Sequence, residues 1–149
     1  MLIGIPPLLG PDFLAILRGM GHGDEIAIVD GNYPAADHAR RLVRADGHGL
    51  LAVVEAVLTV MPLDLAVPAA LFRASLNNDP AQKGEIHRQI DALFARMAAG
   101  LQVVALSGEA LYPRIRGAHA IVATSETALF ANVILRKGVI GAVERGRDA

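Results

Sequence analysis

The sequence comprises 149 residues with a formal net charge of −1, an aromatic content of 4% and no cysteine. This length fits a single domain with a sizeable core. The small net charge and the few aromatic side chains argue against a nucleic-acid partner, which needs a basic surface and platforms for base stacking. The lack of cysteine excludes disulfides and thiolate metal sites and fits a reducing compartment, so we expect a cytoplasmic protein.

Hydrophobic residues account for 53% of the sequence and charged residues for only 19%, with a mean hydropathy of +0.41. This composition predicts apolar surface left over after folding, which a chain of this size can bury between identical subunits. We therefore expect a homo-oligomer. No stretch reaches the roughly 18 apolar residues of a membrane span, and the first ten residues lack a basic leader. The sequence thus predicts neither membrane insertion nor secretion.

The first half of the chain alternates between helical and extended patterns. The expected elements are a helix at 11–20, a strand at 26–29, a turn at 31–34, a short element near 42–44 and a helix at 50–60. The residues at 26–29 are continuously apolar and rich in β-branched side chains, which indicates a strand covered on both faces, as in a parallel sheet. Asp30 follows at the carboxyl end of this strand, and Asp46 is placed to cap the helix at 50–60.

The second half of the chain is less regular. Its expected elements are an extended segment at 65–74 broken by Pro68, a helix from the Asn-Asn-Asp-Pro signal at 77–80 to Gly100, a buried strand at 101–106, a short helix at 108–116 interrupted near Pro113, and strands at 119–124 and 132–135. We predict a single α/β domain over residues 1–140, with a mainly parallel sheet flanked by helices and ligands bound at the carboxyl ends of its strands. The charged segment 141–149 is expected to form a loose tail.

His22 is the candidate catalytic residue that the local pattern suggests. It lies between two glycines, after a predicted helix and before a buried strand, where a sharp turn can direct the imidazole into a cleft. The carboxylates of Asp24 and Asp30 are close in sequence, and a carboxylate beside an imidazole can fix its tautomer or raise its pKa for general acid–base work. A histidine that only caps the helix end, with Asp24 as a helix-end or interface residue, is an equally weighted alternative.

Other kinds of site find less support. His22, Asp24, His38, Asp46 and His48 all occur in the first third of the chain, but no pair shows the spacing typical of a zinc site, so solvated loop histidines are the favoured interpretation. For the same reason we interpret His87 and His119 as surface or edge residues without a role.

Phosphate binding and nucleophilic acyl transfer also lack their sequence signals. The glycines at 19, 21 and 23 follow a helix and precede a strand, which is the reverse of a phosphate-binding loop. Ser107 and Ser125 lack the Gly-x-Ser-x-Gly context of a hydrolase. We expect neither a metal nor a cofactor, and proton transfer is the chemistry that is left.

Several motifs spread over residues 4–139 are specific in combination. They are Gly-Ile-Pro-Pro-Leu-Leu at 4–9 with Pro11, Met-Gly-His-Gly-Asp-Glu-Ile at 20–26 with Asp30 and Pro34, Arg-Ala-Asp-Gly at 44–47, Pro-Leu-Asp at 62–64, Ala-Ile-Val-Ala-Thr at 120–124 with Glu126, and Asn-Val-Ile-Leu-Arg-Lys-Gly-Val at 132–139. By these motifs the sequence resembles the fucose mutarotase and ribose pyranase family. The stretches at 21–25 and 44–47 are more similar to the fucose branch.

The resemblance implies a ribose-pyranase-like fold and an enzyme that interconverts the ring forms of free monosaccharides such as fucose or ribose, without metal or cofactor. It also implies ring-shaped homo-oligomers, commonly decamers. Residue by residue, it places the family's proton-donating histidine on His22 and its substrate-binding aspartate on Asp30. Its aromatic-small-Asn sugar-binding triplet falls on Phe130, Ala131 and Asn132, and Tyr112 matches a tyrosine usual in the fucose branch.

The sequence departs from the family pattern at three positions, which affects the expected sugar more than the fold. Phe130 stands where the fucose branch has tyrosine, so a hydroxyl is missing. Gly108 stands where the fucose branch has arginine and the ribose branch histidine, although Arg114 or Arg116 could reach the same space. Ser125 replaces a glycine.

Opening a hemiacetal ring requires one proton delivered to the ring oxygen and one removed from the anomeric hydroxyl. In this interpretation His22 serves one end of the reaction and Asp30 holds sugar hydroxyls. The second proton carrier is either water or Tyr112, and whether neighbouring subunits share a site is open. Two alternative functions remain: a protein that binds or helps to transport a monosaccharide without turning it over, and a structural subunit that forms rings.

Overall fold

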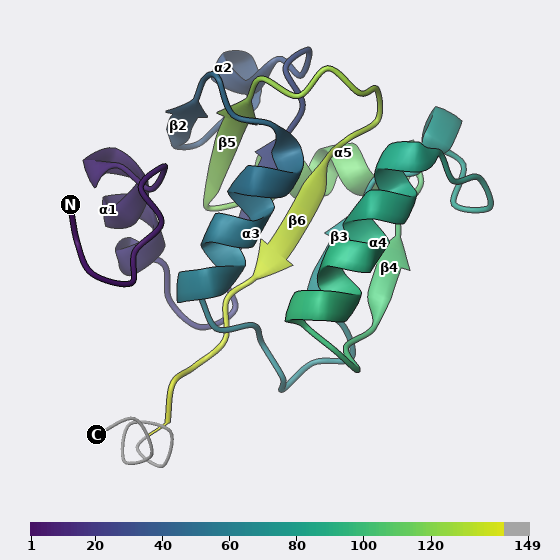
Figure 1. Ribbon diagram of the computed structural model, residues 1–149. Helices are drawn as coiled ribbons and strands as arrows, with labels where there is room; N and C mark the ends of the chain where they lie inside the picture. The colour runs from purple at the N-terminus through teal and green to yellow at the C-terminus, as the bar shows by residue number, and fades with distance from the viewer. Residues whose placement is uncertain (142–149) are drawn as a thin grey trace.

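The computed structural model describes residues 1–141, in which six strands form one sheet in the order β2-β5-β1-β6-β3-β4 (Figure 1). In chain order, the elements are α1 (Pro11–Gly19), β1 (Glu25–Val29), α2 (Ala35–His38), β2 (Leu42–Ala45), α3 (Leu50–Val60), β3 (Leu71–Arg73), a 3-10 turn at Leu76–Asn78, α4 (Glu85–Met97), β4 (Val103–Ala105), α5 (Gly108–Gly117), β5 (Ala120–Thr124) and β6 (Val133–Arg136).

The sheet is mixed, with one reversed strand among the strands described. β5 pairs in parallel with β2 and β1, and β3 pairs in parallel with β4, whereas β6 runs antiparallel to both of its neighbours, β1 and β3. The predicted α/β class and mainly parallel sheet are therefore confirmed. Reversal of β6 has a consequence for function, because its amino end lies beside the carboxyl end of β1.

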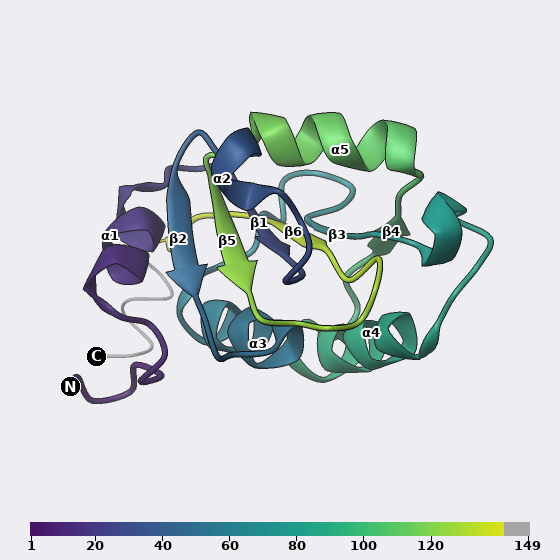
Figure 2. The same ribbon diagram turned by 90° about the horizontal axis from the view of Figure 1, so that it is seen from above.

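Helices cover both faces of this sheet, as Figure 2 shows: α3 and α4 lie on one face, α5 and α2 on the other, and α1 lies along the β2 edge. Successive residues of β1 point to opposite faces. Ile26 and Ile28 join the apolar cluster under α3 and α4, whereas Ala27 and Val29 join the cluster under α5. All four side chains are fully buried, which confirms the strand expected at 26–29.

Helix α3 occupies the predicted residues 50–60, but the expected cap is wrong. Asp46 forms an exposed ion pair with Arg44 at 2.8 Å instead. The first backbone N–H of α3, that of Leu50, donates to Glu126 Oε1 at 3.1 Å. A carboxylate from a distant loop therefore satisfies this helix end, which an inspection of the preceding residues alone could not reveal.

Several elements of the second half differ from expectation. Only Leu71–Arg73 of the segment 65–74 forms a strand. Helix α4 begins at Glu85 rather than at 80, because residues 79–82 form a turn in which the Gln82 backbone N–H donates to the Asp79 carbonyl at 2.8 Å. Strand β4 is half-buried rather than buried, since it lies at the sheet edge. Helix α5 continues through Pro113 and omits one backbone hydrogen bond there.

Apart from Gly141, the tail predicted at 141–149 lies outside the described residues. Within residues 1–141, no helix is both long and apolar enough to cross a membrane.

Candidate active site

A cavity of about 700 Å³ opens at the carboxyl end of β1. Three segments that are far apart in the sequence form its wall: the loop and short helix after β1, helix α5, and the residues just before β6. The antiparallel direction of β6 explains the third segment, because it brings residues 129–132 beside the end of β1. The lining residues are Asp30, Asn32, Tyr33, Pro34, His38, Tyr112, Pro113, Arg116, Leu129, Phe130 and Asn132.

Asp30 and Asn132 are polar lining residues at the strand ends, and a hydrogen bond joins them. Asn132 Oδ1 accepts a hydrogen bond from the Asp30 backbone N–H at 3.1 Å. The Asp30 carboxylate accepts from the backbone N–H groups of Asn32 at 3.0 Å and Ala131 at 3.3 Å. Burial raises the pKa of Asp30, although these N–H groups favour its ionised form. Only 7% of Asp30 is exposed, so its carboxylate faces little water other than that in the cavity.

Ala131 is fully buried and does not line the cavity; its contribution is the backbone N–H that holds Asp30. Phe130 lines the cavity with its backbone in the left-handed region, at φ 55°, which a side chain other than glycine rarely adopts. The predicted triplet thus provides an apolar face, a backbone donor and an amide.

His87 fixes the backbone of Phe130, and its expected surface location is wrong. The imidazole is fully buried. Its Nδ1 accepts from the Gly84 backbone N–H at 2.9 Å, so in the neutral ring Nε2 carries the proton and donates to the Phe130 carbonyl at 2.9 Å. Burial lowers the pKa of His87, which favours this neutral form. The sequence interpretation failed because the helical stripe of α4 does not reveal what packs against position 87.

Aromatic and basic side chains from α5 and the loop after β1 complete the wall. Tyr112 stacks on Tyr33 with ring centroids 6.3 Å apart, and its hydroxyl donates to Asn78 Oδ1 at 3.3 Å. His38 contacts both the Tyr33 hydroxyl and Arg116. The expectation of a solvated loop histidine is therefore wrong for His38, which lines the cavity.

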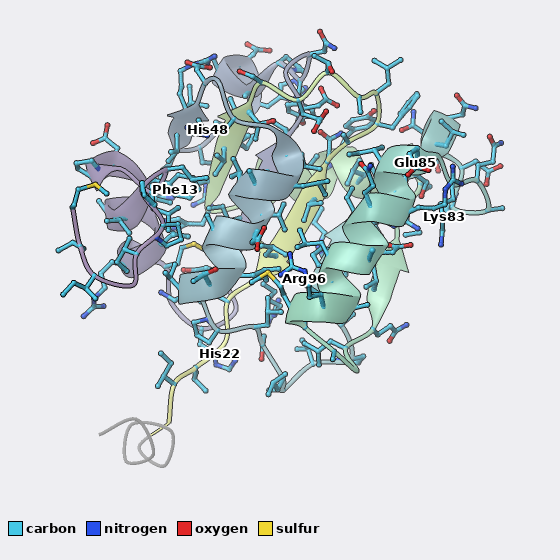
Figure 3. The ribbon with its side chains drawn as sticks, in the orientation of Figure 1. Phe13, His22, His48, Lys83, Glu85 and Arg96 are labelled. Atoms are coloured by element: carbon cyan, nitrogen blue, oxygen red, sulfur yellow. The ribbon has the colours of Figure 1, made fainter. Side chains whose placement is uncertain are left out.

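The structure does not bring His22 to this cavity. His22 lies between α1 and β1, so the whole of β1 separates it from Asp30. His48 marks the opposite end of the sheet, because its backbone carbonyl accepts a hydrogen bond from Ser125, which follows the carboxyl end of β5. Figure 3 shows His22 and His48 at opposite ends of the molecule. Half of the His22 side chain is exposed, and its Nε2 lies 3.1 Å from Asp64 Oδ1. Asp24 does not contact it but accepts from the Gly21 backbone N–H at 2.7 Å.

Asp64 is the hydrogen-bond partner of His22, and the spacing of the sequence does not predict it. Its side chain is buried and also accepts from Arg136 Nε at 2.8 Å and from the Ala66 backbone N–H at 3.0 Å. These contacts, that with Arg136 foremost, lower the pKa of Asp64 to about 2. An ionised carboxylate favours a proton on the imidazole nitrogen that faces it. Asp64 belongs to the Pro-Leu-Asp motif, but nothing in the sequence links it to His22.

Two of the three departures from the family pattern, Gly108 and Ser125, contact segments distant in the sequence. Gly108 packs against Asn78, and a Cβ at this position would lie 2.9 Å from the Asn78 side chain. Ser125 accepts a hydrogen bond from the Gly47 backbone N–H at 2.7 Å. Of the two arginines considered for the space near Gly108, Arg116 lines the cavity, whereas Arg114 is paired with Glu25 at 2.7 Å.

The cavity combines a carboxylate, an amide, a phenol and aromatic faces, which suits a small polyhydroxylated ligand. No group of three or more histidine or acidic side chains that could hold a metal occurs within residues 1–141.

Comparisons with known proteins agree with this geometry. Residues 3–140 match the RbsD / FucU transport protein family. The chain is 37% identical to human fucose mutarotase over 143 residues, which cover 92% of this chain and 93% of that protein. Among solved structures, it superposes with a TM-score of 0.81 on the fucose mutarotase of Streptococcus pneumoniae in complex with L-fucose, at 36% identity, covering 94% of this chain and 100% of that one.

A more distant structure, Bacillus subtilis RbsD complexed with D-ribose, has a TM-score of 0.71 at 20% identity, covers 89% of this chain and 95% of that one, and supports the fold. The chain belongs to the RbsD/FucU family.

Proposed function

We propose that this protein is a monosaccharide mutarotase that acts on L-fucose or a sugar of similar shape. The observation that carries the proposal is the buried Asp30–Asn132 pair at the base of a cavity walled by aromatic side chains. Aromatic faces suit the C–H surface of a sugar ring, and the polar pair suits its hydroxyls. Relatives named fucose mutarotase at 36–37% identity over more than nine-tenths of the chain support the same reaction. The cysteine-free sequence fits a cytoplasmic location.

The proposed reaction is ring opening followed by closure on the other face. One group protonates the ring oxygen while another takes the proton of the anomeric hydroxyl, and positioned acids or bases each contribute about 10²–10⁴-fold. Asp30 and Asn132 hold sugar hydroxyls, and Phe130 and Tyr112 hold the ring. His22 serves one of the two proton transfers. No metal or cofactor takes part in this scheme.

Because His22 lies beyond the far end of β1, we propose that it acts in the cavity of an adjacent copy of the chain. Exposed apolar side chains lie near both places: Leu129 on the cavity rim is 64% exposed, and Val139 and Ile140 are 60% and 55% exposed. The segment leading to these last two pairs with the loop that carries His22, since the Gly23 backbone N–H donates to the Lys137 carbonyl at 2.8 Å. A head-to-tail contact of two unlike surfaces generates a ring when it closes, as in the expected decamer.

A sugar-binding or transport-accessory role without turnover is the second candidate. The feature that favours it is Phe130, which lacks the hydroxyl of the fucose branch, combined with the absence of His22 from the cavity of its own chain. The two functions differ in one measurable property, the rate of anomer exchange.

Saturation-transfer NMR on L-fucose, D-ribose and D-galactose tests the proposal. We expect faster exchange between the anomers of L-fucose than in buffer alone. Binding of a sugar, seen in a thermal-shift or titration experiment, without faster exchange of any of the three would establish the second candidate instead. A purely structural subunit would show neither response.

A further inference from the structure

Three side chains in the cavity wall form a hydrogen-bonded chain that the scheme above does not use. Arg116 Nη2 on α5 lies 2.6 Å from His38 Nε2 on α2, and His38 Nδ1 lies 2.9 Å from the Tyr33 hydroxyl. The imidazole meets the Tyr33 ring edge-on, with centroids 5.2 Å apart and an interplanar angle of 84°. All three residues line the cavity. These hydrogen bonds connect α5, α2 and the loop after β1, so they hold the three parts of the cavity wall together.

The direction of each hydrogen bond in this chain follows from its first member. A guanidinium can only donate hydrogen bonds, so His38 Nε2 must accept from Arg116. The neutral imidazole then carries its proton on Nδ1 and donates it to the Tyr33 oxygen. As a result, His38 does not use the proton of the Tyr33 hydroxyl itself, which is available to an acceptor in the cavity.

The surrounding groups keep the Tyr33 hydroxyl protonated. Burial raises the pKa of Tyr33; Arg116 lowers it to a smaller extent, and stacked Tyr112 raises it by less still, so the net direction is upward. Asp37 is the nearest carboxylate to His38, 3.9 Å from Nε2, but it is 87% exposed and more distant than Arg116. At neutral pH, Tyr33 is thus a phenol that His38 and Arg116 hold in a single orientation.

Other candidates for a second proton carrier are less well placed. The Tyr112 hydroxyl donates to Asn78 at the outer part of α5, and Tyr112 is 36% exposed. Phe130 has no hydroxyl. Tyr33 lies in the loop directly after Asp30, so both side chains reach the same cavity from the same end of β1.

Building on the proposed function, we propose that Tyr33 is a catalytic residue that donates its hydroxyl proton to the ring oxygen of the bound sugar, with His38 and Arg116 as positioning residues. As the bond between the anomeric carbon and the ring oxygen breaks, its electron pair stays on the ring oxygen, which takes the Tyr33 proton. His22 takes the proton of the anomeric hydroxyl, and that O–H electron pair becomes the second bond of the aldehyde carbonyl. On closure both protons return, and in between His38 Nδ1–H and Arg116 stabilise the Tyr33 phenolate.

The central test replaces Tyr33 by phenylalanine, which keeps the ring stacked on Tyr112 and removes only the hydroxyl. We expect Y33F to lower kcat for L-fucose anomer exchange by about 10²-fold with a much smaller change in KM. Y112F is expected to affect KM more than kcat. A Y33F protein that exchanges L-fucose anomers at the wild-type rate would overturn the proposal.

Two variants at His38 separate positioning from mere support of the fold. H38N keeps an N–H near the position of Nδ1 that can donate to Tyr33, whereas H38D offers an acceptor that draws the Tyr33 proton away from the sugar. We expect H38D to lose as much kcat as Y33F and H38N to retain most of it. R116Q is expected to lower kcat as well, and R40Q is its matched control, because exposed Arg40 donates a hydrogen bond to the Gly117 carbonyl and does not line the cavity. Equal losses in H38N and H38D would contradict the assigned hydrogen-bond direction.

Nitrogen-15 NMR of His38 tests the direction of the Arg116–His38–Tyr33 hydrogen bonds without relying on turnover. The wild type should show a protonated Nδ1 and an unprotonated Nε2, and R116Q should shift the proton toward Nε2. A wild-type His38 with its proton on Nε2 would overturn this inference. A wild type that accelerates exchange of no sugar would instead overturn the proposed function together with it, whereas wild-type rates in Y33F would defeat only the role of Tyr33.

Discussion

The two ends of strand β1 are built in different ways. At the carboxyl end, Asp30 is buried and held mainly by backbone N–H groups and the amide of Asn132. At the amino end, His22 is half exposed and is held by one contact to Asp64. The first end is a finished cavity in a single chain, whereas the second presents its imidazole outward. This difference is what the proposal of a site shared between copies would require, with His22 of one copy serving the cavity of the next.

The largest expected effects come from removing the central group at each end. H22Q should lower anomer exchange by about 10²–10⁴-fold because it removes a proton-transfer group, and D30N should abolish most of the exchange because the sugar hydroxyls lose the carboxylate that binds them; saturation-transfer NMR measures both. In the wild type, the loss of activity on the acid side should begin above the usual aspartate pKa, because burial raises the pKa of Asp30. A fully active H22Q would show that His22 takes no part in the reaction at the Asp30 cavity.

Co-expression of these two inactive variants tests whether the ends meet between subunits. If each site uses Asp30 of one copy and His22 of the next, random assembly leaves about a quarter of the sites intact and restores about a quarter of the activity. If both residues served the same chain, no activity would return. Size-exclusion chromatography with light scattering on the same samples would give the size of the assembly.

His87 tests how far the cavity end depends on one buried side chain. H87Q should lower the free energy of unfolding by about 1–3 kcal/mol, because the half-buried Gly84 N–H and Phe130 carbonyl lose their hydrogen bonds to the buried imidazole. It should also raise KM more than it lowers kcat, since the left-handed backbone of Phe130 loses its anchor. H48Q, at another histidine, is the control and should change stability by no more than about 0.5 kcal/mol.

The pH dependence of the His87 effect has a defined sign. Burial lowers the pKa of His87 below 6.5 in the folded protein, so the unfolded chain binds a proton more readily. The stability that the wild type owes to neutral His87 is therefore present above pH 6.5 and is lost as the pH falls below it. Urea unfolding of the wild type and H87Q at several pH values measures this loss.

The smallest effect on activity is expected from Asp64, the carboxylate that orients His22, rather than from His22 itself. D64N should lower activity by about tenfold, because His22 loses the carboxylate that orients it. The pKa of Asp64 is lowered from 3.8 to about 2, so its stabilising contribution is present above pH 4 and is lost as the pH falls from about 4 to about 2. The stability difference between the wild type and D64N should narrow over this range. D46N, at an exposed ion pair, is the control and should alter stability less.

Sequence patterns predicted the parts of this molecule that depend on local periodicity. Strand β1 and helix α3 match their expected ranges because continuous β-branched residues and helical spacing are properties of neighbouring positions. The motifs also placed Asp30, Phe130, Tyr112 and Asn132, which the structure gathers in one cavity.

Contacts between distant segments could not be predicted in the same way. The cap of α3 by Glu126, the link from His22 to Asp64 and the anchoring of Phe130 by His87 each join residues that the sequence separates widely. A histidine such as His87 is polar by composition, and only its neighbours in space determine that it is buried. The hydrogen bonds that link Arg116, His38 and Tyr33 depend on α5 lying beside α2, which sequence periodicity does not specify.

Strand β6 sets the spacing between the two ends. Asn132 just before it fixes Asp30, and Arg136 at its end fixes Asp64 and thereby His22. At about 3.3 Å per residue, these two anchors are about 13 Å apart along the strand. In the proposed ring, that distance would contribute to the spacing between one site and the next. If the proposed ring forms, deleting or inserting a single residue in β6 would change the distance between neighbouring sites as well as the register of the sheet, so the length of this strand has little freedom to vary.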